Sequence, residues 1–191
     1  KLFQIEFLST LSGELLITLV YHRPLDEAWE AEARDLATRL GCKLIGRSRK
    51  QKIVLDDEWV DEALEVNGEQ YRYRQPEQSF TQPNGPINQM MMQWLLSECE
   101  PTNTDLLELY CGIGNFTLPL AQKFRQVVAT ELSKKATEAA HWNAAMNNVS
   151  NVSFARLSAE DMTLALANTR HFRRLEHLPQ PLSQYDFSTL L

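Results

Sequence analysis

The segment from Asp105 to Thr117 constrains the fold of this chain more than any other, and it reads Asp-Leu-Leu-Glu-Leu-Tyr-Cys-Gly-Ile-Gly-Asn-Phe-Thr. An apolar strand leads into a loop with two glycines, and the loop leads into the start of a helix. Gly112 and Gly114 let the backbone approach a ligand closely, and the helix start behind them presents free N–H groups. The segment therefore predicts a ligand-binding loop in an α/β fold.

The same loop disfavours two common ligand classes, dinucleotides such as NAD and nucleoside triphosphates. A dinucleotide fingerprint would have a third glycine where this chain has Thr117, and no Walker lysine follows the loop. Glu131 ends the next predicted strand, 17 residues beyond Gly114. A carboxylate there can accept hydrogen bonds from both hydroxyls of a ribose, so an adenosine-containing ligand is predicted. A glycine turn followed by a solvated glutamate is the alternative on spacing alone.

The second half of the chain continues this alternation of strands and helices. A helix that begins at Pro86 is predicted from the helical spacing of Ile87, Met90, Met91, Trp94 and Leu95. Met90 to Met92 and Trp94 are interpreted as residues that pack this helix on the sheet. The remaining predicted elements are strands at 106–110, 127–130, 152–155 and 186–191, with helices from the glycine loop to about Phe124 and after Ser133. Glu160 and Asp161 are interpreted either as groups near an adenine or as an acidic pair at a helix N-terminus. The rhythm predicts a parallel α/β sheet.

The first half has the pattern of a separate α+β domain. Its predicted elements are a hairpin over 3–21, a helix between Asp26 and Gly41, strands at 43–48 and 52–55, and a second hairpin around Asn67-Gly68. Tyr71 and Tyr73 are interpreted as core residues rather than as platforms for stacked bases. Because the pattern changes near Pro86, we expect one domain over residues 1–83 and a second over residues 84–191.

The charge pattern limits the partners of the chain. The 191 residues carry a net charge of −6, which argues against a surface that binds polyanions throughout. The charge is segregated, however, with five cations and no acid between Gly41 and Lys52. Two interpretations stay open for this run, contact with RNA phosphates or a solvated face, and they apply to Arg47, Arg49, Lys50, Lys52, Arg72 and Arg74.

Other sequence features argue against further classes of protein. Cys42, Cys99 and Cys111 are too few and too scattered for a disulfide framework, and neither they nor the histidines have metal-ligand spacing. No apolar run approaches the roughly 18 residues of a membrane span, and no signal-peptide layout is present. We therefore expect a cytoplasmic protein without a metal or a membrane partner. Both ends of the chain are apolar, so we interpret it as a piece of a longer protein.

The residues from Glu108 to Phe116, taken with Gln78 to Asn84, resemble the RNA 5-methyluridine methyltransferases, and most closely those that act on tRNA. The resemblance covers essentially the whole chain, including Gly46 to Lys52. It implies an α/β fold, with an incomplete Rossmann-like class I methyltransferase domain preceded by part of an α+β central domain. It also implies S-adenosylmethionine as the cofactor. The positions that correspond to cofactor contacts are Gln82, Tyr110, Asn115 and Glu131, to which we add the loop glycine Gly112.

The implied activity is methylation of uridine C5 at T-loop position 54 of tRNA, and in the T-like loop of tmRNA. In this chemistry a cysteine thiolate adds to C6, the resulting enolate attacks the sulfonium methyl group, and a base removes the C5 proton. The family's Asp-Pro-Pro-Arg and Ser-Cys-Asn-Pro motifs do not occur here, so no catalytic residue is expected in this chain. The chain alone is expected to be inactive and to self-associate through the unpaired strand near 186–191.

Two alternatives stay open at this point. The first is a 5-methyluridine methyltransferase that acts on rRNA instead of tRNA. The second is a non-catalytic module that binds RNA or S-adenosylmethionine. The residues that follow Leu191 in a longer protein would distinguish them, because a cysteine motif there would favour an enzyme.

Overall fold

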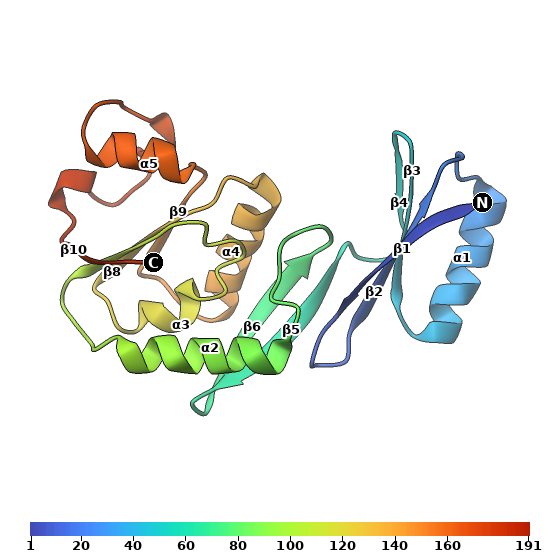
Figure 1. The fold of residues 1–191 in the computed structure, drawn as a ribbon. Helices are drawn as coiled ribbons and strands as arrows, with labels where there is room; N and C mark the ends of the chain where they lie inside the picture. Colours follow the sequence, from blue (N-terminus) through green and yellow to red (C-terminus); the bar gives the residue numbers. More distant parts are fainter. The chain divides into compact units, whose positions relative to one another are not determined.

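The computed structural model describes residues 1–191, and its contacts divide the chain into two compact units (Figure 1). Unit 1 consists of Lys1–Ala63 and Arg74–Gln78, and unit 2 consists of Leu64–Tyr73 and Ser79–Leu191. The second hairpin is divided between them, since its base belongs to unit 1 and its tip to unit 2. The two units therefore have boundaries other than those of the expected domains over residues 1–83 and 84–191.

Unit 1 is built on a four-stranded sheet with the strand order β1-β2-β3-β4. Its elements are β1 (Leu2–Ser9), β2 (Leu15–Tyr21), α1 (Glu27–Leu40), β3 (Lys43–Ser48) and β4 (Gln51–Val54). The pairs β1/β2 and β3/β4 are antiparallel, whereas β2 and β3 are parallel because α1 connects them. The predicted hairpin, helix and strands of this region are confirmed.

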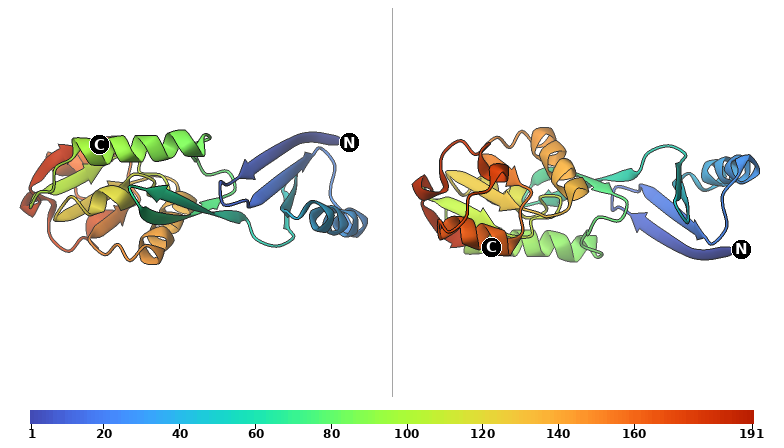
Figure 2. Two further views of the ribbon diagram at one scale, coloured as in Figure 1. Left: turned by 90° about the horizontal axis from the view of Figure 1, so that it is seen from below. Right: turned by 90° about the horizontal axis from the view of Figure 1, so that it is seen from above.

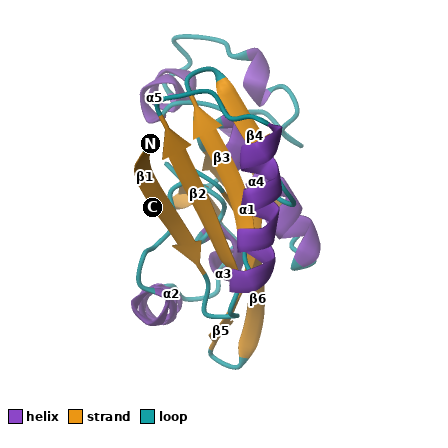
Figure 3. Cartoon of the chain, turned by 90° about the vertical axis from the view of Figure 1, so that its right-hand side faces the viewer, coloured by secondary structure: helices purple, strands orange, loops and turns teal.

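Helix α1 covers one face of this sheet (Figure 3). At its start Asp26 Oδ1 accepts a hydrogen bond from Trp29 N at 2.9 Å, and at its end Gly41 has a left-handed φ of 61°. The Trp29 indole lies against Gly46 of β3, where a Cβ atom would come within 2.1 Å of the ring. Glycine at this position therefore allows the helix and the strand to approach closely.

The second hairpin consists of β5 (Trp59–Val66) and β6 (Glu69–Pro76). Its turn residues Asn67 and Gly68 have φ angles of 53° and 83°, as the predicted type I′ turn requires. Tyr71 and Tyr73 are 9% and 1% exposed, so the prediction that they are core residues is confirmed.

Unit 2 contains a parallel sheet with the strand order β10-β7-β8-β9. Its elements are α2 (Gly85–Glu98), β7 (Asp105–Glu108), α3 (Thr117–Ala121), β8 (Gln126–Thr130), α4 (Lys134–Met146), β9 (Val152–Ala155), α5 (Ala159–Leu166), two short 3-10 turns (Arg173–Leu175 and Leu182–Gln184) and β10 (Phe187–Leu190). Helices α2, α3 and α4 pack on one face of the sheet, and α5 with the segment after it packs on the other (Figures 1 and 2). The predicted parallel α/β sheet is confirmed.

Helix α2 buries a different face from the one that its apolar stripe predicted. Ile87, Met90 and Trp94 are 48%, 60% and 62% exposed, whereas Met92 and the polar Asn88 are almost fully buried. The prediction that this helix packs on the sheet is confirmed, and Met92 lies in the contact as predicted, but the prediction was wrong for Met90 and Trp94. The physical reason is that Asn88 has a specific hydrogen-bonding partner inside unit 2, which favours the face that carries it.

Two elements beside the glycine loop are shorter than predicted. Strand β7 ends at Glu108 rather than at Tyr110, because Tyr110 has a φ of 55° and cannot continue a strand. Helix α3 ends at Ala121 rather than near Phe124, since the chain turns there toward β8. The loop between β7 and α3 thus spans residues 109–116.

None of the helices combines the length and the apolar composition that a membrane span requires.

Candidate functional site

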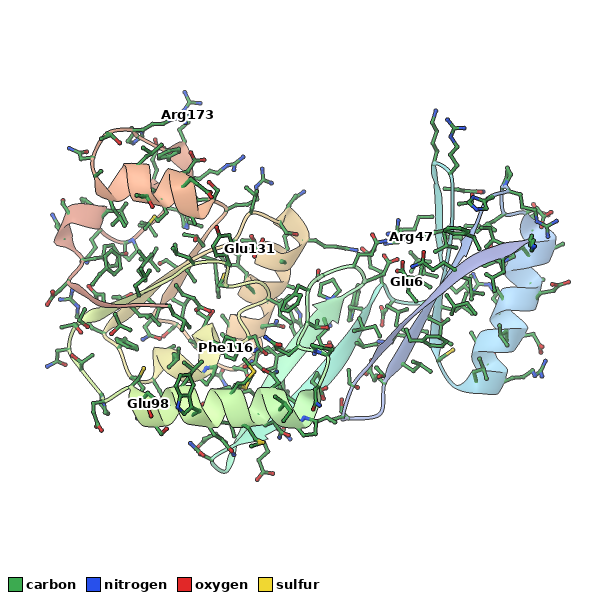
Figure 4. All side chains as sticks on the ribbon, in the orientation of Figure 1. Glu6, Arg47, Glu98, Phe116, Glu131 and Arg173 are labelled. Carbon is green, nitrogen blue, oxygen red and sulfur yellow. The ribbon has the colours of Figure 1, made fainter.

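The loop over residues 109–116 lies where the chain changes direction across the sheet of unit 2. Strand β8 pairs with one side of β7, and β10 pairs with the other side. In open α/β sheets this point, outside the carboxyl ends of the strands, is where ligands bind. Figure 4 labels Phe116 in this loop and Glu131 at the end of β8. The loop is therefore the candidate binding site of unit 2.

Three residues of the loop have left-handed backbone conformations. The φ angles of Tyr110, Gly112 and Gly114 are 55°, 57° and 85°. The two glycines adopt such angles without strain, whereas Tyr110 does so at a cost, and its side chain is 71% exposed. A strained residue with an exposed ring supports the hypothesis that Tyr110 contacts a ligand.

The structure brings Glu131 and Gly112 together, as predicted. Glu131 Oε2 accepts a hydrogen bond from Gly112 N at 3.1 Å, and Oε1 accepts one from Ser133 N at 2.7 Å. These two N–H groups fix the carboxylate at the edge of the loop. Each oxygen keeps a second lone pair, so the carboxylate can accept hydrogen bonds from a ligand's hydroxyl groups.

Asn115 is held from two sides. Its side-chain amide exchanges two hydrogen bonds with the amide of Asn88 on α2, at 2.9 and 2.8 Å. Its backbone oxygen accepts a hydrogen bond from the Tyr73 hydroxyl at 2.9 Å. Asn115 therefore lies in the loop as predicted, and its side chain also anchors the loop to α2.

Sequence reasoning missed the residues that support the loop from behind. In addition to Asn88 and Tyr73, Asn143 of α4 is fully buried and donates a hydrogen bond to the Ile113 carbonyl oxygen at 2.9 Å. The available signal was an asparagine within an otherwise apolar helix face, since a buried amide needs hydrogen-bonding partners. Asn88 and Asn143 both have this signature.

Glu108 is a further buried polar residue that sequence reasoning did not assign to the site. It is the last residue of β7 and is 2% exposed. Burial raises its pKa to about 7, and the neighbouring Thr117 hydroxyl lowers it only in part. Neither Glu108 Oε2 nor Thr117 Oγ1 has a hydrogen-bonding partner of normal geometry. A carboxyl group that is partly neutral near pH 7 thus lies directly before the loop.

The remaining predicted positions lie outside this arrangement. Gln82 lies in the segment before α2, is half-buried and makes no hydrogen bond to the glycine loop, so its role stays a prediction. Glu160 and Asp161 lie in the first turn of α5, behind the cap Ser158. This is the position that the helix-terminus interpretation predicted.

Two of the five cations between Gly41 and Lys52 pair with one buried carboxylate, Glu77. Arg47 makes two hydrogen bonds to Glu77, at 2.6 and 2.7 Å, and Lys52 Nζ lies 3.1 Å from Glu77 Oε2 (Figure 4 labels Arg47). Lys52 also pairs with Glu58. Arg47 and Lys52 are therefore ion-paired within unit 1, which favours an internal network over phosphate contact for these two cations, and their contact with RNA stays a prediction.

Among the other cations proposed to contact RNA, some are paired within the protein and others are not. Arg74 Nε lies 3.3 Å from Asp61 Oδ1, and its guanidinium stacks over the Trp59 ring. Arg49 and Lys50 occupy the turn between β3 and β4, are exposed and form no ion pair. These two side chains are available to an external anion.

A comparison with protein families shows to which family the chain belongs. The family described as tRNA (Uracil-5-)-methyltransferase matches residues 1–191, which is the whole chain. The chain belongs to the tRNA (uracil-5-)-methyltransferase family. The resemblance inferred from the glycine loop and the segment before α2 is thereby confirmed.

Individual members of this family are similar to the chain along its whole length. The tRNA/tmRNA (uracil-C(5))-methyltransferase of Aromatoleum aromaticum is 55% identical over 190 residues, which cover 100% of this chain and 51% of that protein. The protein of the same name from Cellvibrio japonicus is 52% identical over 190 residues, with 100% and 51% coverage. The chain spans about half the length of the curated relatives that it matches.

A solved structure shows the fold class. The crystal structure of Pyrococcus abyssi tRNA (uracil-54, C5)-methyltransferase in complex with S-adenosyl-L-homocysteine matches with a TM-score of 0.56 and 18% identity. The match covers 78% of this chain and 38% of that one. The prediction of a Rossmann-like class I methyltransferase fold is confirmed.

The three free cysteines of this tRNA (uracil-5-)-methyltransferase family member are partly or fully buried. Burial raises the pKa of all three thiols, and it does so most strongly for Cys111, which is 5% exposed. Nucleophilic cysteines need a lowered pKa and access to the substrate. The expectation that no catalytic residue lies in this chain stays a prediction.

Proposed function

We propose that this chain supplies the S-adenosylmethionine-binding site of an enzyme that methylates uridine C5 at position 54 in the tRNA T-loop, and in the T-like loop of tmRNA. The observation that carries the proposal is the Glu131 carboxylate, which Gly112 N and Ser133 N fix beside the glycine loop. It occurs in a chain that matches the tRNA (uracil-5-)-methyltransferase family throughout. Residues 84–191 would then form the cofactor domain, and residues 1–83 would form a domain that meets RNA.

The residues at the loop fit S-adenosylmethionine. Glu131 would accept hydrogen bonds from the ribose hydroxyls, while Tyr110 presents an exposed ring and the glycines leave the backbone open to close approach. Gln82 would complete the site from the segment before α2. The cofactor supplies an electrophilic methyl group, and the part of this chain is to bind and orient the group that carries it. The free thiols fit a reducing compartment, and we propose the cytoplasm.

The test is transfer of a labelled methyl group by the intact protein to a tRNA transcript. We expect label in 5-methyluridine at position 54 and none in a transcript with cytidine at that position. Label in rRNA but not in tRNA would favour the rRNA methyltransferase. Cofactor and RNA binding without transfer by the intact protein would favour the non-catalytic module.

We also propose that Arg49 and Lys50 contact RNA phosphates, because they are the cations of the run that are exposed and unpaired. Replacing both with Ala in the intact protein removes two such contacts. The plot of log affinity against log salt concentration for tRNA should then become shallower by about 1.5 units, since each phosphate contributes about 0.7 to 0.9. Filter binding at four or more salt concentrations measures this slope.

A matched control removes two other exposed cations, Arg39 and Lys134. Each is already paired with an acid one helical turn away, at 3.6 and 3.5 Å. Their replacement with Ala should leave the slope unchanged. Equal slopes for the Arg49→Ala, Lys50→Ala protein and the unmodified protein would assign the β3–β4 turn to a solvated face.

A further inference from the structure

A carboxyl group with an unsatisfied oxygen is buried directly beneath the glycine loop. Glu108 ends β7, is 2% exposed, and its Oε2 atom has no hydrogen-bonding partner. The hydroxyl of Thr117, at the start of α3, is also fully buried and lies close enough to lower the pKa of Glu108, but it has no hydrogen-bonding partner of normal geometry. Buried polar atoms in native proteins are nearly always hydrogen-bonded, so a pair of exceptions at a binding loop needs an explanation.

The ionisable groups that meet Glu108 are neutral. Tyr73 of β6 is fully buried, and burial together with Tyr71 and Glu108 raises the pKa of its hydroxyl well above the ordinary value. Burial, Glu108 and Glu131 likewise raise the pKa of the Cys111 thiol. From α3 the nearest group is the uncharged Thr117 hydroxyl, and none of the groups that shift the pKa of Glu108 is a cation. The charged form of this carboxyl group is therefore not compensated by the groups that surround it.

Glu108 also lies near the place where a ligand would bind. The Cys111 thiol is within electrostatic reach of both Glu108 and Glu131, and Glu131 in turn accepts a hydrogen bond from Gly112 N. Glu108 thus ends the strand before this loop, and Glu131, which is proposed to bind the ribose, follows the neighbouring strand and is hydrogen-bonded to the loop. A charge placed on this loop acts on Glu108 through a water-poor interior, where electrostatic effects are poorly screened.

We propose that Glu108 distinguishes the charged methyl donor from its neutral product, because its carboxyl group releases a proton to solvent when the sulfonium ion binds and regains one when the thioether remains. This inference rests on the proposed cofactor of the chain. A bound cation stabilises the carboxylate, whereas S-adenosylhomocysteine carries no charge on sulfur and does not. Binding of the donor is then linked to proton release, and binding of the product is not.

The linkage predicts different pH dependences for the two ligands. Because burial raises the pKa of Glu108 to about 7, the carboxyl group is mostly protonated at pH 6 and half protonated at pH 7. The affinity for S-adenosylmethionine should rise about fivefold between these two pH values, and that for S-adenosylhomocysteine should stay nearly constant. At pH 6.5, where the α-amino groups of both ligands remain protonated, binding of the donor should release about 0.7 of a proton. Calorimetry of the intact protein in buffers of different ionisation enthalpy measures this number.

Two variants separate this role from a structural one. Glu108→Gln keeps the shape of the side chain and removes the titration, so proton release and the pH dependence of donor binding should disappear. Glu98→Gln neutralises an exposed carboxylate at the end of α2 and should change neither. If the Glu108→Gln protein does not fold, the difference in proton release between donor and product in the unmodified protein decides the matter.

The outcomes distinguish this inference from the proposed function. Equal proton release with donor and product, in a protein that binds both, would overturn the role of Glu108 and leave the cofactor assignment intact. Failure of the intact protein to bind either ligand would overturn both. Loss of affinity for the two ligands by the same factor in Glu108→Gln, with the pH dependence retained, would show that the residue only supports the loop.

Discussion

Replacing Glu131 with Ala in the intact protein is expected to weaken S-adenosylmethionine binding by about a hundredfold. Hydrogen bonds to a charged group contribute about 1.5 to 3 kcal/mol each, and about 2.7 kcal/mol corresponds to a factor of a hundred in affinity. The Glu131 carboxylate has free lone pairs for two such bonds after those to Gly112 N and Ser133 N are counted. Calorimetric titration of the variant with the cofactor measures the loss.

Two controls distinguish a lost ribose contact from a collapsed loop. An analogue without ribose hydroxyl groups should bind the unmodified protein and the Glu131→Ala protein with similar affinity. Glu138→Ala removes an exposed acid on α4, which pairs with Lys134 at 3.5 Å, and should leave cofactor affinity unchanged. An unaltered affinity in Glu131→Ala would show that this carboxylate does not bind the ribose.

The features that sequence reasoning predicted correctly depend on residues close together in the chain. Asp26 caps α1 by accepting a hydrogen bond from Trp29 N, three residues away, and Ser133 caps α4 in the same way. The Asn67-Gly68 turn needs only two left-handed residues. The position of the glycine loop between a strand and a helix belongs to this class as well, since the strand, the two glycines and the helix start are contiguous in the chain. Such local signals can be recognised without knowledge of tertiary contacts.

The features that sequence reasoning missed depend on interaction partners that are far away in the chain. Asn88 faces inward because it pairs with Asn115, 27 residues later, and no periodicity of α2 contains that information. Arg47 pairs with Glu77, 30 residues later, so a run of cations that predicts phosphate contact is partly an internal network. Glu108 could be recognised only after its burial was known. Functional interpretation of polar residues therefore requires their tertiary partners.

The Glu77 carboxylate is expected to be the largest single electrostatic contribution to the stability of unit 1. It is 3% exposed, and although burial alone would raise its pKa, hydrogen bonds from Arg47 and Lys52 and their charges lower it to about 2. Relative to the ordinary value of 4.5, this shift corresponds to about 3 kcal/mol of folding free energy. Replacing Glu77 with Gln should destabilise the unit by a similar amount, because it leaves Arg47 without its carboxylate and removes one of the two carboxylates that pair with Lys52.

The direction in which folding shifts the pKa of Glu77 determines how its contribution to the stability of unit 1 depends on pH. A carboxyl group whose pKa is lowered by folding stabilises the folded state above its unfolded pKa, and the stabilisation is lost as the pH falls through the folded value. The difference in stability between the unmodified protein and Glu77→Gln should therefore be about 3 kcal/mol at pH 6 and below about 1 kcal/mol at pH 2. Hydrogen exchange of the β3 and β4 amides reports this difference within unit 1.

An exposed ion pair in the same unit provides the comparison. Asp35 lies 3.6 Å from Arg39, and both side chains are more than two-thirds exposed, so Asp35→Asn should change stability by less than about 1 kcal/mol at either pH. A Glu77→Gln protein that behaves like Asp35→Asn would show that Arg47 and Lys52 are satisfied by solvent. In that case both cations would again be available to RNA, and the restriction of the phosphate contacts to Arg49 and Lys50 would no longer hold.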